Sequence, residues 1–463
     1  MTSSPDCPAN GQRYGSGVTQ LTTTRAGLPP GLRLPDALQA ILLMRYRPTV
    51  MRRLHQQHGD VFSIRMPYGP HGSMVTVVAL ANPEDIRQVF AGNVTTYHAG
   101  EGNSSLLDVM GEHSLLLLDE GQHARARKLL TPAFTTGALN GYRPMFADLA
   151  RAEIERWSDG DEFAAIGRMQ AITLEIILRV VFGVTDPERL AELRPLVTKI
   201  ANLDLIMLLA WRYPQLQKLP PWRGHAAAQQ ELDNLLYAEI AARRADPTTS
   251  DRDDLLSRLL RPSDDGDVLT DAELRDQLIT FLLAGHETTA TALSWTLHEL
   301  AHHPEAMSRA QQAVDNPSLE SDQYLEAVVK EAMRLRPVIF QATRTLTEDT
   351  DVAGYRLPAG VVVSPALGLV GLSEALHDDV SEFRPDRFLG SNPSTNTWIP
   401  FGGGPRRCIG AAFSLVESVE ILRELLRAYE IEPVRPRPEH LRPRGIINAP
   451  SHGSRIRVRA RAS

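Results

Sequence analysis

The sequence FGGGPRRCIG occupies residues 401–410 and places one thiol, that of Cys408, in a glycine-rich loop. A helical pattern over residues 411–426 follows this loop directly. Backbone N–H groups and the positive end of a helix lower the pKa of a thiol and favour the thiolate. The only other cysteine is Cys7, which excludes a zinc site of four cysteines. One thiolate is nevertheless sufficient as the axial ligand of a haem.

The loop fits the pattern F-x-x-G-x-R-x-C-x-G and resembles the haem-binding loop of the cytochrome P450 family. The resemblance implies haem b (iron protoporphyrin IX), with Cys408 as the iron ligand and Phe401, Arg406 and Gly410 beside the cofactor. It also implies a haem-thiolate monooxygenase, which inserts one atom of O2 into a C–H or C=C bond.

The composition of the chain predicts which partners and compartments it meets. Of its 463 residues 43% are hydrophobic, and the formal net charge of −7 argues against a nucleic acid partner. Two cysteines predict no disulfide framework and therefore a reducing compartment. No basic segment followed by an apolar stretch marks a signal peptide, so we expect a cytoplasmic protein. The apolar stretch 205–211 is expected near the surface and allows at most peripheral membrane contact.

The order of patterns along the chain predicts one mainly α domain with a smaller β-rich part, built around a buried haem. Residues 1–27 are rich in Ser, Thr, Gly and Pro and are expected to be disordered, whereas 28–463 form the domain. Strand pairs are predicted at 61–66 with 74–79 and at 352–357 with 361–364. Helical periodicity covers most of the remainder, including 149–157, 169–182, 224–245 and 324–335.

A long helix is predicted to cross the domain. Thr270 and Glu273 form the capping-box pattern that opens it, and helical periodicity lasts until Pro304, a length of about 50 Å. Its middle, 278–284, is apolar on nearly every side and should be buried. The sequence GHETT at 285–289 then places a glycine and an ionisable group in this buried helix, which costs stability and indicates a functional site.

This helix segment resembles the A/G-G-x-D/E-T motif of the same family. The resemblance implies that Thr288 hydrogen-bonds the dioxygen activated at the haem and that Glu287 relays protons to it. The alternative is a Glu287 on a solvated helix face. His286 is expected to face away from the haem.

The pattern E-x-x-R at Glu331 and Arg334 is, alone, an ordinary i,i+3 ion pair. Its position before Cys408, together with Arg387, resembles the family's charge network. The resemblance implies that the three side chains form a buried, fully paired network that steadies the cysteine loop.

Four basic side chains are candidates for binding the two haem propionates, which need cationic or donor partners. His123 and Arg127 lie one helical turn apart and share a face. By resemblance Arg344 and Arg406 complete the set, and for each of the four the alternative is a surface charge.

The substrate and the electron donor are predicted only as classes. By resemblance the pocket draws on 97–111, 205–211, 282–285, 338–340 and 446–447, mostly apolar segments that favour a small apolar substrate. Too few residues follow Cys408 for a fused reductase, so a separate ferredoxin or flavodoxin-like donor with its reductase is expected.

A basic surface is predicted as the docking site of this donor. Arg125 and Lys128, together with Arg407, would form it behind the cysteine loop and attract an acidic protein. The alternative is that these are ordinary solvated charges.

Two other functions stay open at this point. One is a peroxide-driven hydroxylase or an isomerase on the same scaffold, against which the presence of both Glu287 and Thr288 argues. The other is a non-catalytic haem sensor or carrier.

Overall fold

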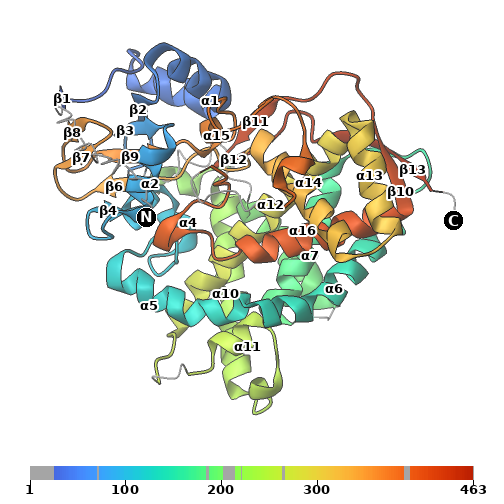
Figure 1. Cartoon of the computed structure of the whole chain (residues 1–463). Coiled ribbons are helices and arrows are strands. Elements are labelled where there is room, and N and C mark those ends of the chain that lie inside the picture. The colour runs from blue at the N-terminus through green and yellow to red at the C-terminus, as the bar shows by residue number, and fades with distance from the viewer. Residues whose placement is uncertain are drawn as a thin grey trace, which may run out of the picture.

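The computed structural model describes residues 25–69, 72–183, 187–201, 214–220, 222–262, 266–390 and 397–461. A large helical part fills one side of the molecule, and a smaller part rich in strands fills the other (Figure 1). The predicted division into a mainly α fold with a smaller β-rich part is therefore confirmed.

The helical part packs around one long central helix, α12 (Asp271–His302), which Figure 1 shows running through the middle of the molecule. The other long helices of this part are α5 (Glu120–Leu130), α6 (Thr136–Ile154), α7 (Ala165–Phe182), α8 (Pro187–Ala201), α10 (Trp222–Ala245), α13 (Pro304–Asp315), α14 (Leu319–Leu335) and α16 (Ala411–Ala428). Shorter helical turns complete it: α3 (Ala99–Gly102), η2 (Ser104–Leu106), α4 (Leu107–Met110), η3 (Thr131–Phe134), η4 (Pro214–Lys218), η5 (Thr249–Asp251), α11 (Leu255–Leu259), η6 (Pro385–Phe388) and η7 (Gly404–Arg406).

The β-rich part is built on a five-stranded sheet with the strand order β2-β3-β9-β6-β4. Its strands are β2 (Val61–Met66), β3 (Val75–Leu80), β9 (Val362–Pro365), β6 (Arg344–Leu346) and β4 (Tyr97–His98). The helices α1 (Asp36–His58), α2 (Pro83–Ala91) and α15 (Leu367–Val370) accompany it. Smaller sheets are formed by β1 (Arg25–Ala26), β8 (Tyr355–Leu357) and β7 (Thr350–Val352); by β10 (Tyr429–Pro433), β13 (Arg455–Ala460) and β5 (Glu162–Ala164); and by β11 (Leu441–Arg444) with β12 (Ile447–Pro450).

One of the two predicted strand pairs is right and the other is wrong. β2 and β3 form the expected antiparallel pair, with Val61 opposite Leu80. The segment 352–357 is not one strand, because the chain turns at Ala353 and Gly354 and pairs β7 with β8. β9 joins the large sheet between β3 and β6 instead of pairing with that hairpin.

Three further expectations concern the ends and the surface of the chain. Residues 1–24 of the segment predicted to be disordered and the apolar stretch 205–211 lie outside the described residues. Arg25–Ala26 pair with β8, so regular structure begins before the predicted boundary at residue 28. Among the described helices, none has the length and apolar character needed to cross a membrane.

The central helix begins as the sequence predicts and joins two hydrophobic clusters. Thr270 Oγ1 accepts a hydrogen bond from the N–H of Glu273 at 3.2 Å, and Glu273 accepts one from the N–H of Thr270 at 2.8 Å. The first half of the helix, up to Leu283, packs into one cluster with α7, α8 and α10. The second half, from Ala290 on, packs into another with α6, α14 and α16. The segment 284–289 between them belongs to neither cluster, so its side chains can line a functional site.

A buried charge network ties α14 to the chain that leads to Cys408. Glu331 and Arg334 have fully buried side chains that pair at 2.7 Å, and Arg387 donates to Glu331 at 2.9 Å. Arg334 also donates to the carbonyl oxygens of Gly371 and Val380. The predicted network is therefore present and fixes the segment 371–388 against α14.

Removing the acid from this network should destabilise the protein and loosen its cofactor. Glu331→Gln leaves the Arg334 guanidinium buried without a carboxylate, so we expect the free energy of unfolding to fall by about 3–5 kcal/mol. Urea denaturation and the haem content after purification measure the effect. Glu326→Gln is the matched control, because Glu326 pairs with Lys330 at the surface of the same helix and should cost at most about 0.5 kcal/mol. Equal stability of the two variants would contradict the structural role of Glu331.

Candidate active site

The cysteine loop is held by its own backbone and by close packing against α2. The N–H of Cys408 donates to the carbonyl oxygen of Phe401 at 2.9 Å, and that of Arg407 donates to Gly404 at 3.0 Å. Gly404 has φ +65°, and a Cβ there would lie 1.9 Å from the carbonyl oxygen of Phe90. Only glycine fits this position, which explains part of the glycine run before the thiol.

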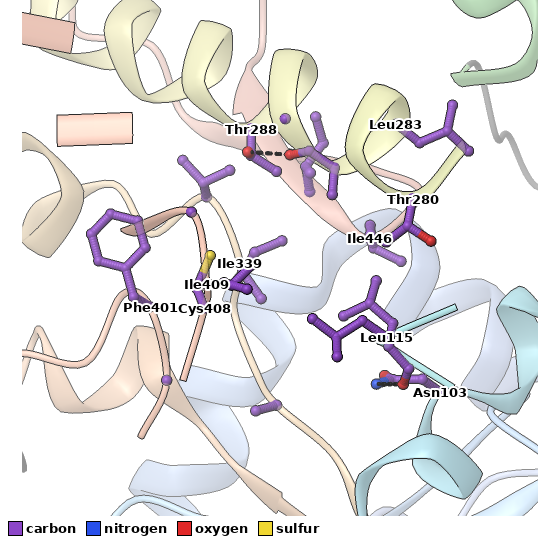
Figure 2. Close-up of a pocket in the computed structure, with 18 of the residues that line it drawn as sticks. Asn103, Leu115, Thr280, Leu283, Thr288, Ile339, Phe401, Cys408, Ile409 and Ile446 are labelled. Carbon is purple, nitrogen blue, oxygen red and sulfur yellow. Dashed lines mark hydrogen bonds between the residues drawn. The ribbon is translucent and has the colours of Figure 1, made fainter. Parts of the chain in front are cut away.

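Cys408 opens into a cavity of about 450 Å³ that lies between the cysteine loop and α12. Figure 2 shows the sulfur of Cys408 on one side of this cavity and the side chain of Thr288 on the other. Every site residue predicted from the sequence lines it: Glu287, Thr288, His123, Arg127, Arg344, Phe401, Arg406, Cys408 and Gly410. The fold thus brings together residues that are spread over nearly three hundred positions.

The segment of α12 between the two hydrophobic clusters forms one wall of the cavity. Ala284, Gly285, Glu287 and Thr288 face the cavity, in a helix whose residues are otherwise mostly buried. A Cβ on Gly285 would lie 2.9 Å from the side chain of Ile177, so the glycine lets α7 approach α12 closely. The expectation for His286 is confirmed, since its ring is buried away from the cavity and contacts the carbonyl oxygen of Leu282 at 2.7 Å.

Two polar side chains of this wall differ in their partners. The hydroxyl of Thr288 donates to the carbonyl oxygen of Ala284 at 2.7 Å, one turn earlier in the helix. Glu287 lies 3.9 Å from the guanidinium of Arg444, at the end of β11. Burial raises the pKa of Glu287, and the charge of Arg444 opposes this shift. Glu287 is therefore a carboxyl that holds its proton to higher pH than usual beside the cavity.

Four basic side chains meet in the wall below α12. Arg406 pairs with Asp119 and donates to the carbonyl oxygen of Leu115 at 3.1 Å. Burial, with Arg406 and Arg127 close by, lowers the pKa of His123 to about 4. Burial and the charge of Arg406 likewise lower the pKa of Arg344 to about 10. Positive charge is thus crowded here and would be relieved by an anionic group.

The residues present fit a haem. The crowded cations suit its two propionates, and the thiol of Cys408 faces the same cavity. Within the described ranges no cluster of three or more His, Cys, Asp and Glu side chains could hold a metal ion. The expectation of a lowered thiol pKa is wrong for the protein alone, because desolvation of the Cys408 thiol raises its pKa by more than the N–H of Gly410 and the charges of Arg127 and Arg407 lower it. A coordinating metal ion deprotonates a thiol by its own charge.

The family model described as Cytochrome P450 matches residues 29–454. The chain belongs to the cytochrome P450 family. It is accordingly a haem-thiolate monooxygenase, an enzyme that works with a haem cofactor, a substrate and a redox partner.

Cytochrome P450 relatives cover almost the whole chain. Cytochrome P450 135A1 of Mycobacterium tuberculosis (strain H37Rv) is 47% identical, over 94% of this chain and 96% of its own. Cytochrome P450 135B1 of Mycobacterium bovis is 44% identical, over 95% of this chain and 93% of its own. A solved structure, described as retinoic acid bound cyanobacterial CYP120A1, has a TM-score of 0.79 and 23% identity over 94% of this chain and 99% of that one.

Three polar residues that the sequence analysis did not predict also line the cavity of this cytochrome P450. Arg47 of α1, Tyr68 after β2 and Gln341 before β6 line it, although none stands in a recognisable motif. The predicted segments 97–111, 282–285, 338–340 and 446–447 all contribute to the wall, whereas 205–211 lies outside the described residues.

Glu417 of α16 is a carboxyl near the cytochrome P450 cavity that sequence reasoning also missed. Its side chain is fully buried and hydrogen-bonds Thr289, and its Oε2 atom has no partner among the described residues. Thr289 and Ser414, whose hydroxyls lie 3.1 Å apart, both line the cavity. Burial raises the pKa of Glu417 well above its usual value. The signal in the sequence is a glutamate on the apolar face of the helix that follows Cys408.

The prediction of a basic docking surface on α5 is wrong for Arg125, its main residue. Arg125 donates to Asp267 at 2.8 Å and to Glu273 at 2.5 Å, and these bonds raise its pKa. The charge of Lys128 acts on the same Asp267. Arg125 therefore ties α5 to the start of α12 and is not left to a partner protein.

Replacing Cys408 should remove the spectral signature of a thiolate-bound haem. The ferrous carbon monoxide complex of the parent is expected to show a strongly red-shifted Soret band, because a thiolate ligand produces it and a histidine does not. Cys408→Ala should abolish this band, whereas Cys7→Ala should leave it unchanged. A normal red-shifted band in the Cys408→Ala protein would rule out this thiol as the ligand.

The raised pKa of Glu417 predicts a pH dependence of stability. The folded protein keeps this proton above the ordinary glutamate pKa of 4.5, where the unfolded chain releases it. The free energy of unfolding should therefore fall as pH rises above about 4.5, by up to about 1.4 kcal/mol per pH unit from this group. Glu417→Gln removes the titrating group and should flatten the fall between about pH 5 and 8 in urea denaturation.

The matched control for this measurement is Glu420→Gln on the same helix. Glu420 pairs with Arg143 at 2.5 Å, so its carboxylate has a cationic partner that Glu417 lacks among the described residues. Its variant should keep the pH dependence of the parent. If Glu417→Gln keeps it as well, Glu417 is not the group responsible.

Proposed function

We propose that this cytochrome P450 inserts one atom of O2 into a small apolar substrate held beside Cys408, with electrons from a separate ferredoxin or flavodoxin-like donor and its reductase. The reaction consumes R–H, O2, two electrons and two protons, and it yields R–OH and water. The observation that carries the proposal is the position of Thr288 across the cavity from Cys408 (Figure 2), with Glu287 lining the same cavity.

The lining of the cavity supports an apolar substrate. Apolar side chains come from several elements and dominate the wall beside α12: Leu106, Leu115, Ile177, Leu283, Ile339 and Ile447. Such a surface binds hydrocarbon by removing it from water, while the few polar groups orient the molecule.

The residues on the thiol side hold the cofactor. When bound, haem supplies the activation of O2, assisted by electron density from the thiolate. In this proposal Cys408 binds the iron, and His123, Arg127, Arg344 and Arg406 hold the propionates. Phe401 and Gly410 of the cysteine loop line the same cavity and would help to hold the ring. The crowding of positive charge around Arg344 supports this assignment.

The residues on the α12 side supply protons. Two protons must reach one oxygen atom for it to leave as water, so a positioned acid and a positioned hydroxyl are required. Glu287 keeps its proton to higher pH than usual because it is buried, and it faces the cavity. Thr288 presents its hydroxyl to the same space. We assign the acid to Glu287 and the hydrogen-bonding group to Thr288.

The alternative functions explain less of this geometry. A peroxide already contains reduced oxygen, so a peroxide-driven hydroxylase or an isomerase does not need a buried acid on α12. A haem sensor needs neither the acid nor the apolar cavity. Burial of a carboxyl costs stability, and that cost is understandable where the carboxyl delivers protons.

The docking surface for the electron donor is expected around the cysteine loop. Arg407 is exposed there, next to the thiol through which the electron path is shortest. Because Arg125 is paired within the protein, Arg407 is the cation of the predicted set that we assign to an acidic donor.

Replacing Thr288 tests the assignment of the proton-delivering side. Thr288→Ala should keep haem and substrate binding but divert most electrons into hydrogen peroxide, because the oxygen would lose its positioned hydrogen-bonding group. The measurement compares the product and the peroxide formed per electron pair, with a substrate chosen by its low-spin to high-spin Soret shift.

The matched control for this experiment is Thr296→Ala. The hydroxyl of Thr296 also donates to a carbonyl one turn earlier, at 2.9 Å from Ala292, but it is fully buried. It should leave the product per electron pair unchanged. Unchanged product per electron pair in Thr288→Ala would overturn the role of Thr288.

A further inference from the structure

Buried arginines in the described residues divide into those with a carboxylate partner and those without one. Five arginines are at most 9% exposed, and three of them form ion pairs shorter than 3 Å. These are Arg243 with Asp254, Arg275 with Asp233, and Arg334 with Glu331. The remaining two, Arg344 and Arg47, both line the cavity. Arg344 belongs to the group assigned to the haem propionates, which leaves Arg47 to be explained.

Arg47 is a buried cation whose hydrogen bonds satisfy only part of its guanidinium. It is 4% exposed, and no described carboxylate lies within ion-pair distance of it. Its two Nη atoms donate to the carbonyl oxygens of Gly445 at 2.9 Å and Ile446 at 3.4 Å. Its Nε atom has no partner among the described residues. Neutral carbonyls do not compensate a buried positive charge, so the site favours an anion.

The backbone around Arg47 holds the side chain in place. Tyr46 has non-helical angles, φ −137° and ψ 25°, and Pro48 follows within the helix, so α1 is kinked at Arg47. The bonds to Gly445 and Ile446 join this kink to the turn between β11 and β12. Figure 1 shows α1 beside β11. An arginine fixed in this way loses little freedom when it binds a ligand.

Tyr68 provides a second donor next to Arg47. Its hydroxyl oxygen accepts a hydrogen bond from Gln341 Nε2 at 2.9 Å, so the hydroxyl proton points to another acceptor. Burial raises the pKa of Tyr68, which therefore stays protonated. The Oε1 atom of Gln341 has no partner among the described residues either, but it is an acceptor and gives a carboxylate no attraction. The formal charge of Arg47 decides the preference at this site.

We propose that the apolar substrate of this enzyme carries a carboxylate, which Arg47 binds with Tyr68 as the second donor. The inference rests on the proposed function, because it places the substrate in the cavity beside Cys408. A planar carboxylate accepts two parallel bonds from a guanidinium, an arrangement that a neutral ester or alcohol cannot match in strength. The rest of the substrate lies along the apolar wall.

The test compares two ligands that differ only in charge. Dodecanoic acid and its methyl ester are titrated into the haem-loaded protein at about pH 8, where the acid is ionised. Isothermal titration calorimetry gives the dissociation constants, and the Soret shift confirms binding near the haem. We expect the acid to bind about tenfold or more tightly than the ester. Acids from decanoic to hexadecanoic are included to match the length of the cavity.

Variants assign the preference to Arg47. Arg47→Gln should bring the acid and the ester to equal affinity, and Arg47→Lys should keep part of the preference because it keeps the charge. If the substitution loosens the turn at Gly445, the acid and the ester bind more weakly by the same factor. The ratio of their dissociation constants is then unchanged. Arg444→Gln removes a cation of the β11–β12 hairpin that also lines the cavity, and it should leave the preference intact.

Several outcomes would overturn the inference while leaving the proposed function standing. They are equal binding of acid and ester by the parent, absence of binding by every acid of the series, a preference that survives Arg47→Gln, and a preference lost in Arg444→Gln instead. The red-shifted carbon monoxide band and the electron diversion in Thr288→Ala do not depend on Arg47. Failure of those two measurements would instead contradict the proposed function.

Discussion

The ion pair between Glu331 and Arg334 determines where Cys408 lies. Both side chains are fully buried, and Arg334 uses its other donors on backbone carbonyls of the segment 371–388. A buried ion pair is not in itself a large source of stability, because desolvation offsets the attraction. The ion pair instead fixes the backbone, because only one conformation of the segment 371–388 places its carbonyl oxygens where the donors of Arg334 can reach them. The cysteine loop follows this segment, so the position of the thiol depends on charges remote from it.

The buried arginines of this protein serve either the fold or the cavity, depending on whether they have a carboxylate partner. Where buried arginines meet a carboxylate of the same chain, as Arg243 meets Asp254, they fasten one element to another. Where no described residue supplies a carboxylate within ion-pair distance, as for Arg344 and Arg47, the arginine lines the cavity. The same physical penalty on an unpaired charge thus stabilises the fold in one place and favours an anionic ligand in the other.

Sequence reasoning succeeded where a local pattern fixes the outcome. The capping box at Thr270, the inward position of Glu287 and the pairing of Glu331 with Arg334 each follow from spacing or from a family motif. It failed for the strand at 352–357, because the chain turns at Ala353 and Gly354, both with positive φ, and the two three-residue strands on either side pair with each other. It also assigned Arg125 to a partner protein, since the acids that bind it come from residues more than a hundred positions away. Arg47 stands in no motif, and only the kink in α1 brings it to the cavity.

The two carboxyls with raised pKa near the cavity differ in their access to solvent. Glu417 is 1% exposed and its unpartnered oxygen is sealed within the protein, so a proton lost there is replaced slowly. Glu287 faces the cavity and lies 3.9 Å from Arg444, whose side chain is 44% exposed. A group that delivers protons in every catalytic cycle must recover them from solvent each time. Glu287 meets this condition and Glu417 does not. The β11–β12 hairpin therefore serves both functions of the cavity, because Arg444 lies beside the acid and the turn after it is bound by Arg47.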